Sequence, residues 1–222
     1  MSQGRLVSDW DDYLARLRED AHLLVAWGYT DTRDKLQKAR DECDITSLLA
    51  DAMDRRINDP RTPERFTLYS VHNERPISPT GELGKERPKL DIQIERCGVR
   101  PKPHYTFEAK RLRDDDKATV SDSLAHYLGD EGVGRFVADR YEAESAEAAM
   151  LACIQAHDAE VWLGHVARAF AEDVTSGRNR LKIVEQLRRC HIIAELPDEA
   201  STIHRRVRGS AIRLLHIFLC CT

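Results

Sequence analysis

Residues Lys89 to Leu112, KLDIQIERCGVRPKPHYTFEAKRL, read as two strands joined by a short basic loop that carries two prolines. Apolar and polar residues alternate in both, and the apolar members are Leu90, Ile92 and Ile94, then Tyr105, Phe107 and Ala109. Successive side chains of a strand point to opposite faces of the sheet. The alternation therefore predicts one apolar and one polar face for each strand.

The polar faces of these strands are expected to bring three charged side chains together. If the loop spans Gly98 to Pro103, Asp91 lies opposite Lys110 and Gln93 lies opposite Glu108. Directly opposed residues share a face of the sheet, so Asp91, Glu108 and Lys110 converge. Two carboxylates and one ammonium at adjoining positions can hold a divalent metal and a water beside it.

This arrangement resembles the PD-(D/E)xK nuclease superfamily, whose signature is an Asp near one strand and Glu-x-Lys on the next. The Glu-x-Lys is Glu108, Ala109 and Lys110, and sixteen residues separate Asp91 from Glu108. Leu90, not proline, precedes Asp91. The resemblance implies an α/β, restriction-endonuclease-like fold: an αβββαβ core, a mixed central sheet flanked by helices, with N- and C-terminal additions. The alternative interpretation is a surface hairpin whose outer face is merely charged.

The resemblance also implies roles for individual residues. Asp91 and Glu108 would be ligands of Mg²⁺, for which Mn²⁺ can substitute, and the carbonyl of Ala109 would be a third ligand. Lys110 would position or deprotonate the attacking water, or stabilise the developing charge. Gln93, on the same face, could orient the water or the phosphate.

A fourth acidic residue precedes the hairpin, on a helix predicted from Asp41 to Asn58. Glu42 lies at the N-terminal end of the inward face of this helix. Members of the superfamily often carry an acidic residue on the first core helix that reaches the metal, and Glu42 matches that place. It could equally complement the helix dipole. Asp51 and Asp54 compete for the role from other faces.

Nucleic-acid contacts would have to come from local clusters of basic residues, because the net charge of −4 argues against a general polyanion binder. The candidates for phosphate binding follow the hairpin in the chain: Arg111, Arg113, Lys117, Arg135 and Arg140.

Composition and length describe a globular protein, long enough for one large domain or for a domain with a small appendage. Of 222 residues, 41% are hydrophobic and 32% charged, and no apolar run approaches the ~20 residues needed to span a membrane. No signal-peptide pattern is visible, so we expect a cytoplasmic protein. The six cysteines form no C-x-x-C and no zinc spacing, and they are expected to be reduced.

The chain is expected to divide into an N-terminal helical extension (1–40), a nuclease-like core (41–156), and a C-terminal helix and strands packed on the core (157–222), all in one compact domain. The first helix is predicted to start at Ser8 and to stop at Gly28. Further predicted elements are a strand over 65–72, helices over 119–128, 133–141, 158–174 and 181–189, and a strand over 191–196. Residues 148–156 suit a buried strand, with a helix as the alternative.

The function expected from this pattern is a metal-dependent nuclease that hydrolyses phosphodiester bonds, with DNA favoured over RNA, in bacterial phage defence or restriction. The partner besides nucleic acid would be a second copy or a protein of a defence system. The competing hypothesis is a non-catalytic nucleic-acid-binding or scaffold subunit with a nuclease-like fold in a larger complex. Intact Asp91, Glu108 and Lys110 argue against it. A third hypothesis is a metal-dependent enzyme that acts on another phosphate substrate.

Overall fold

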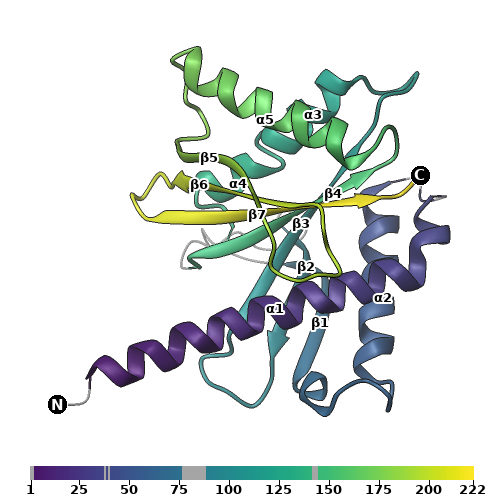
Figure 1. The fold of residues 1–222 in the computed structure, drawn as a ribbon, viewed down its shortest axis with the longest axis vertical. Coiled ribbons are helices and arrows are strands. Elements are labelled where there is room, and N and C mark those ends of the chain that lie inside the picture. Colours follow the sequence, from purple (N-terminus) through teal and green to yellow (C-terminus); the bar gives the residue numbers. More distant parts are fainter. Residues whose placement is uncertain (1–2, 38, 40, 77–88, 142–144) are drawn as a thin grey trace.

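A computed structural model describes residues 3–37, 39, 41–76, 89–141 and 145–222, with side chains placed from Trp10 onward. The described chain forms a seven-stranded mixed sheet with helices on both faces (Figure 1). This confirms the prediction of an α/β protein with a mixed central sheet flanked by helices.

The strands lie in the order β1-β2-β3-β4-β7-β6-β5 across the sheet. β2 is antiparallel to both of its neighbours, β1 and β3. β3, β4 and β7 are parallel, and β6 is antiparallel to both β7 and β5. Their bounds are β1 (Tyr69–Pro76), β2 (Lys89–Arg96), β3 (His104–Leu112), β4 (Glu147–Ile154), β5 (Ile183–Cys190), β6 (Glu199–Arg205) and β7 (Ala211–Cys220).

Two helices cover one face of the sheet and the remaining α-helices lie on the other (Figure 1). The first face carries α1 (Gln3–Leu36) and α2 (Glu42–Ile57); the second carries α3 (Val120–Leu128), α4 (Val133–Val137) and α5 (Ala159–Thr175); a short 3-10 helix, η1 (Glu64–Leu68), precedes β1. Asp41, Thr119 and Asp158 cap α2, α3 and α5 with their side chains, as helix N-termini require.

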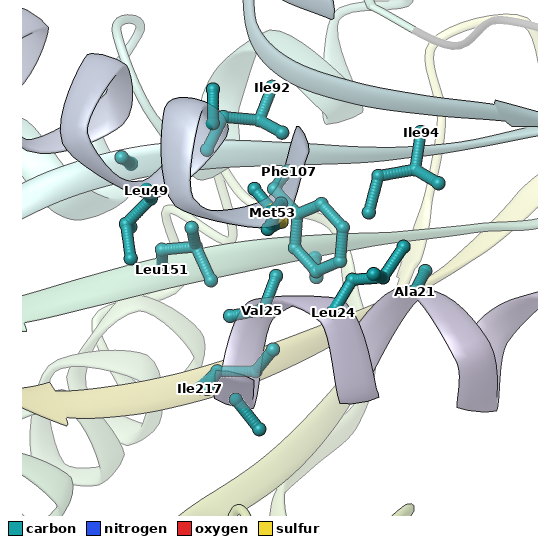
Figure 2. Close-up of a cluster of buried hydrophobic side chains, with 14 of the residues drawn as sticks. Ala21, Leu24, Val25, Leu49, Met53, Ile92, Ile94, Phe107, Leu151 and Ile217 are labelled. Carbon is teal, nitrogen blue, oxygen red and sulfur yellow. The ribbon is translucent and has the colours of Figure 1, made fainter. Parts of the chain in front are cut away.

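Most of the apolar side chains predicted for the hairpin are buried under α1 and α2, but Leu90 packs in the cluster on the other face of the sheet. Figure 2 shows Leu24 of α1 and Met53 of α2 among the side chains that surround Phe107 of β3. Ile92 and Ile94 of β2 belong to the same cluster and have no exposed surface. Burial of these side chains fixes which face of each strand is left for polar residues.

Helix α1 reaches across the sheet to the C-terminal strands. Nδ1 of His22 lies 2.6 Å from a carboxylate oxygen of Glu199 at the start of β6. The hydroxyl of Tyr29 donates a 2.6 Å hydrogen bond to the carbonyl oxygen of Cys220 at the end of β7. Both bonds are buried or partly buried, so α1 is fastened to strands that lie far along the chain.

The predicted stop of the first helix at Gly28 is wrong, because α1 continues to Leu36. A Cβ atom on Gly28 would lie 3.0 Å from the Cγ of Met53 and 3.2 Å from the carbonyl oxygen of Leu49. The glycine therefore marks the point where α1 packs closely against α2, and a side chain there would push the helices apart.

Four further predictions need correction. The strand expected over 65–72 begins only at Tyr69, because residues 64–68 form η1. The helix expected over 181–189 is instead strand β5, which pairs with β6, and 191–196 is not a strand. The helix expected over 133–141 is limited to Val133–Val137. Residues 148–156 do contain the buried strand, β4, between β3 and β7.

The predicted hairpin register is wrong by two residues. Ile92 pairs with Phe107, and Gln93 pairs with Thr106, so Gln93 does not lie opposite Glu108. Asp91 likewise does not lie opposite Lys110. The strands pair as far as Arg96, whose nitrogen donates to Pro103, so the loop starts one residue earlier than expected and the pairing moves with it. A shift of two residues does not by itself move a side chain to the other face. Leu90, beyond the last pair, is the exception, because it packs on the opposite face from Ile92 and Ile94.

Candidate active site

The site lies where β2 and β3 part. Their pairing ends at Ile92 and Phe107, whereas β2 stays paired with β1 as far as Lys89. Asp91 is the first residue of β2 beyond the last pair, and its Oδ2 accepts a 2.8 Å hydrogen bond from the main-chain nitrogen of Ala109. The carboxylate of Asp91 thus accepts the hydrogen bond that a main-chain carbonyl of β2 would accept if the two strands stayed paired. We call this point, where β2 and β3 diverge, the fork.

Glu108, Lys110 and Glu42 converge at this fork. The ammonium of Lys110 donates to Oε1 of Glu108 at 2.9 Å, to the carbonyl oxygen of Ala109 at 2.8 Å, and to Oε2 of Glu42 at 3.1 Å. Glu42, in the first turn of α2, also accepts from the main-chain nitrogen of Arg111 at 3.3 Å. The structure therefore brings together four residues that the sequence selected, from one helix and two strands.

Glu108 is a buried carboxylate whose hydrogen bonding is incomplete. It is 1% exposed, and its Oε2 finds no hydrogen-bond partner within the described parts of the chain. Burial, together with the neighbouring charge of Asp91, raises the pKa of Glu108 to about 8, although Lys110 and Arg135 act in the opposite direction. Burial also raises the pKa of Asp91, opposed by Lys110 and by the bond from Ala109.

Lys110 is held as a cation. Burial would lower the pKa of its ammonium, but Glu108, Glu42 and Asp91 together keep that pKa above its ordinary value. All three hydrogens of an ammonium have an acceptor here. In this arrangement Lys110 donates hydrogen bonds and cannot accept a proton.

Gln93 lies farther along the same polar face of β2, beside a second ion cluster. Its Oε1 accepts a hydrogen bond from Arg75, which also donates to Glu95 at 2.9 Å. Lys102 donates to the other oxygen of Glu95 at 2.5 Å. The hydrogen bond from Arg75 therefore fixes the orientation of the Gln93 side-chain amide.

The basic candidates divide into separate groups. Arg135 of α4 lies 3.5 Å from Oε1 of Glu108, measured from its Nη1. Three others, Arg111, Arg113 and Lys117, line a hollow of about 520 Å³ whose wall includes Glu42. Arg113 also pairs with Asp115, at 2.9 Å from its Nε. Arg140 is exposed.

The residues present fit a hard divalent cation in their chemistry. Within residues 3–37, 39, 41–76, 89–141 and 145–222, no group of three or more His, Cys, Asp or Glu side chains could hold a metal. Asp91 and Glu108 contribute carboxylate oxygens and Ala109 a carbonyl oxygen, which are the ligand types that Mg²⁺ prefers. The unpaired Oε2 of Glu108 is the atom that most needs such a partner.

Tyr141 belongs to this site and was not selected from the sequence. It is fully buried, its hydroxyl donates to the carbonyl oxygen of Lys89, and it accepts a hydrogen bond from Arg135. A buried tyrosine hydroxyl requires a partner, but nothing in the sequence indicates that this partner lies beside Asp91.

A scan against protein-family models, a search of curated proteins and a search of solved structures each found no match. Among the described helices, none is both long and apolar enough to cross a membrane.

Proposed function

We propose that this chain is a metal-dependent nuclease that hydrolyses phosphodiester bonds, DNA in preference to RNA, at the fork between β2 and β3. The observation that carries the proposal is the state of Glu108: its Oε2 is buried, finds no hydrogen-bond partner among the described residues, and lies near the half-buried carboxylate of Asp91. Leaving a buried carboxylate oxygen unpaired costs about 1–3 kcal/mol or more. A bound divalent cation would remove that cost.

The order of elements supports the same proposal. Helix α2 is followed by three antiparallel strands, then by α3 and α4, then by β4, which runs parallel to β3. This is the αβββαβ order that the resemblance to the PD-(D/E)xK superfamily implies. The candidate ligands lie on the second and third strands of that order, as the resemblance also implies.

The chemistry would proceed by hydrolysis. A water oxygen forms a bond to phosphorus, the bond from phosphorus to one sugar oxygen breaks, and the leaving oxygen takes up a proton, which gives a phosphate monoester and a hydroxyl. Mg²⁺ bound by Asp91, Glu108 and the carbonyl of Ala109 would polarise the phosphate and lower the pKa of a bound water.

The residues of the chain would orient the reacting groups. Lys110 holds oxygens of Glu108, Ala109 and Glu42 at fixed distances, which pre-organises the ligand set. Its ammonium would stabilise the phosphate charge after releasing one of these three acceptors. Glu42 keeps Lys110 at the fork from the helix side.

The test is a cleavage assay on plasmid DNA, single-stranded DNA and RNA, with Mg²⁺, with Mn²⁺, and with a chelator. We expect cleavage only when a divalent cation is present, and none from Asp91→Asn, which keeps an acceptor for the nitrogen of Ala109. Cleavage that persists in the chelator, or in Asp91→Asn, would contradict the proposal.

A second candidate is the non-catalytic subunit that binds nucleic acid or serves as a scaffold. The bond from Ala109 to Asp91 favours it, because this bond gives the carboxylate a structural role that needs no metal. This candidate predicts binding of nucleic acid without metal dependence and without cleavage, so the same assay, run beside a binding measurement, separates the two.

A further inference from the structure

Arg135 is the more loosely held of two cations that share one oxygen of Glu108. Its Nη1 lies 3.5 Å from Oε1, which is too long for a good hydrogen bond. The ammonium of Lys110 donates to the same oxygen at 2.9 Å. A competing anion would therefore remove Arg135 from Glu108 more easily than Lys110.

The guanidinium of Arg135 is anchored on its other side. Nη1 donates to the hydroxyl of Tyr141, Nη2 donates to Glu131, and Cζ lies 5.0 Å from the centroid of the Tyr141 ring. The Tyr141 hydroxyl in turn donates to the carbonyl oxygen of Lys89 on β2. Arg135 and Tyr141 thus bridge the fork from Glu108 on β3 to Lys89 on β2.

Arg135 is also the more exposed of the two cations at Glu108. Its side chain is 21% exposed, against 7% for Lys110 and 1% for Glu108. A substrate phosphate can therefore reach Arg135 more easily than Lys110. A guanidinium is planar and always charged, and its paired N–H groups match the two non-bridging oxygens of a phosphodiester.

We infer that Arg135 is a catalytic residue of the proposed nuclease reaction, on which this inference rests. Its guanidinium leaves Glu108 and donates hydrogen bonds to a non-bridging oxygen of the scissile phosphodiester when a divalent cation neutralises Glu108. Arg135 forms no covalent bond and transfers no proton. Its contact strengthens as negative charge grows on the phosphate oxygens in the transition state.

The first test measures binding of Mn²⁺ alone by calorimetry, without nucleic acid. Arg135→Gln removes a cation that competes for Glu108, so the affinity for Mn²⁺ should rise about 1.5-fold to fivefold, the range expected when one partly exposed ion pair stops competing. Arg168→Gln makes the same chemical change at an exposed position on α5 and should leave the affinity unchanged.

The second test compares single-turnover cleavage with affinity for a labelled DNA. Arg135→Gln should cleave about 10²–10³ times more slowly, as when one transition-state donor is lost, and should bind DNA within about threefold of the wild type. Tyr141→Phe keeps the aromatic ring and leaves the charge of Arg135 in place, but it removes the hydroxyl that orients Arg135. It should cleave about tenfold more slowly, and it replaces Arg135→Gln if that variant does not fold.

An Arg135→Gln variant that cleaves at the wild-type rate, or binds Mn²⁺ with wild-type affinity, overturns the inference. Equal losses of rate and of DNA affinity overturn it too, because Arg135 would then contribute only to ground-state binding. If the wild type cleaves no nucleic acid in any metal, the proposed function itself has failed. That result is distinguishable, because the Mn²⁺ measurement still reports on the contact with Glu108.

Discussion

The carboxylate of Asp91 receives a hydrogen bond from the main-chain nitrogen of Ala109, 2.8 Å away, at the last point where β2 and β3 touch. One residue thus ends the pairing of two strands and supplies a candidate metal ligand. The carbonyl of Ala109, whose nitrogen is held by this bond, belongs to the same ligand set. The strand geometry therefore fixes two of the three oxygens relative to each other before any ligand arrives.

Asp91→Asn should weaken Mn²⁺ binding by at least about tenfold, because a neutral amide replaces a charged oxygen ligand. Its thermal unfolding midpoint should stay close to that of the wild type, since the amide oxygen can still accept from Ala109. Isothermal titration with Mn²⁺ measures the first quantity. Asp116→Asn, in an exposed loop, is the control. Wild-type affinity in Asp91→Asn would remove this carboxylate from the ligand set.

Lys110→Ala should lower the cleavage rate by about 10²–10³, the cost of losing one electrostatic contact to the transition state. DNA affinity should change by less than about threefold, because Lys110 is one buried ammonium and several other basic side chains of the protein are exposed. The fold should survive at neutral pH, because Glu108 can take up a proton when the cation that opposes its raised pKa is gone.

Lys110→Arg should fail as well, because the larger guanidinium cannot reproduce three contacts at 2.8 to 3.1 Å. Single-turnover kinetics and fluorescence anisotropy, measured on the same preparations, separate rate from affinity. Wild-type cleavage by Lys110→Ala would show that the hairpin does not carry the chemistry.

Glu108 should make the metal-free protein less stable as the pH rises. Its pKa is about 8 in the folded chain and 4.5 ordinarily, so between these values the folded state binds a proton that the unfolded state has lost. The associated stability is complete below pH 4.5 and falls by up to about 1.4 kcal/mol per pH unit toward pH 8. Urea unfolding at pH 6.5, 7.25 and 8, in a chelator, measures this slope.

In Glu108→Gln the free energy of unfolding should hardly change with pH between 6.5 and 8. Glu185→Gln, a control at an exposed position on β5, should keep the wild-type slope. Added Mg²⁺ should raise the unfolding midpoint of the wild type at pH 8, because binding to the folded state alone stabilises it. A wild-type slope in Glu108→Gln would show that another group is responsible.

Two buried histidines should have the opposite effect: they should make the protein less stable as the pH falls. Thr202 Oγ1 lies 2.7 Å from Nε2 of His204 and 2.8 Å from Nε2 of His216, whose Nδ1 is 2.8 Å from the hydroxyl of Tyr127. Burial lowers the pKa of His204 to about 4 and that of His216 to about 3. Between these lowered pKa values and the ordinary value of 6.5, the two histidines are therefore protonated in the unfolded chain but not in the folded chain.

The stability due to these histidines is complete above their ordinary pKa of 6.5 and is lost as the pH falls toward 4 and 3. In a proton NMR titration from pH 8 to 5, the ring signals of His204 and His216 should not shift. Ring signals of His204 or His216 that shift with a midpoint near 6.5 would contradict this expectation.

Much of the candidate site could be predicted because side-chain alternation survives an error in register. The pairing of the hairpin was displaced by two residues, yet Asp91, Glu108 and Lys110 kept their shared face, because the period of a strand is two. Glu42 could be placed from the apolar stripe of α2, which fixed the direction of the first turn.

The remainder depends on contacts between distant segments. Residues 181–189 were predicted to form a helix, but β6 offers an edge with which β5 pairs, and tertiary pairing outweighs local preference. Gly28 looked like a helix stop because close packing against Met53 cannot be read from the sequence. The contact of Arg135 with Glu108 joins a five-residue helix to a strand, and no periodicity indicates it.

The bonds from α1 to the last strands have a consequence for biosynthesis. The carbonyl that Tyr29 binds lies 191 residues further along the chain. At typical rates of about 5–20 residues per second, the ribosome needs roughly 10–40 s to produce it after Tyr29 has been made. Throughout that interval the apolar side of α1 lacks part of its final cover. A nascent chain of this protein should therefore engage chaperones through α1 until β7 emerges.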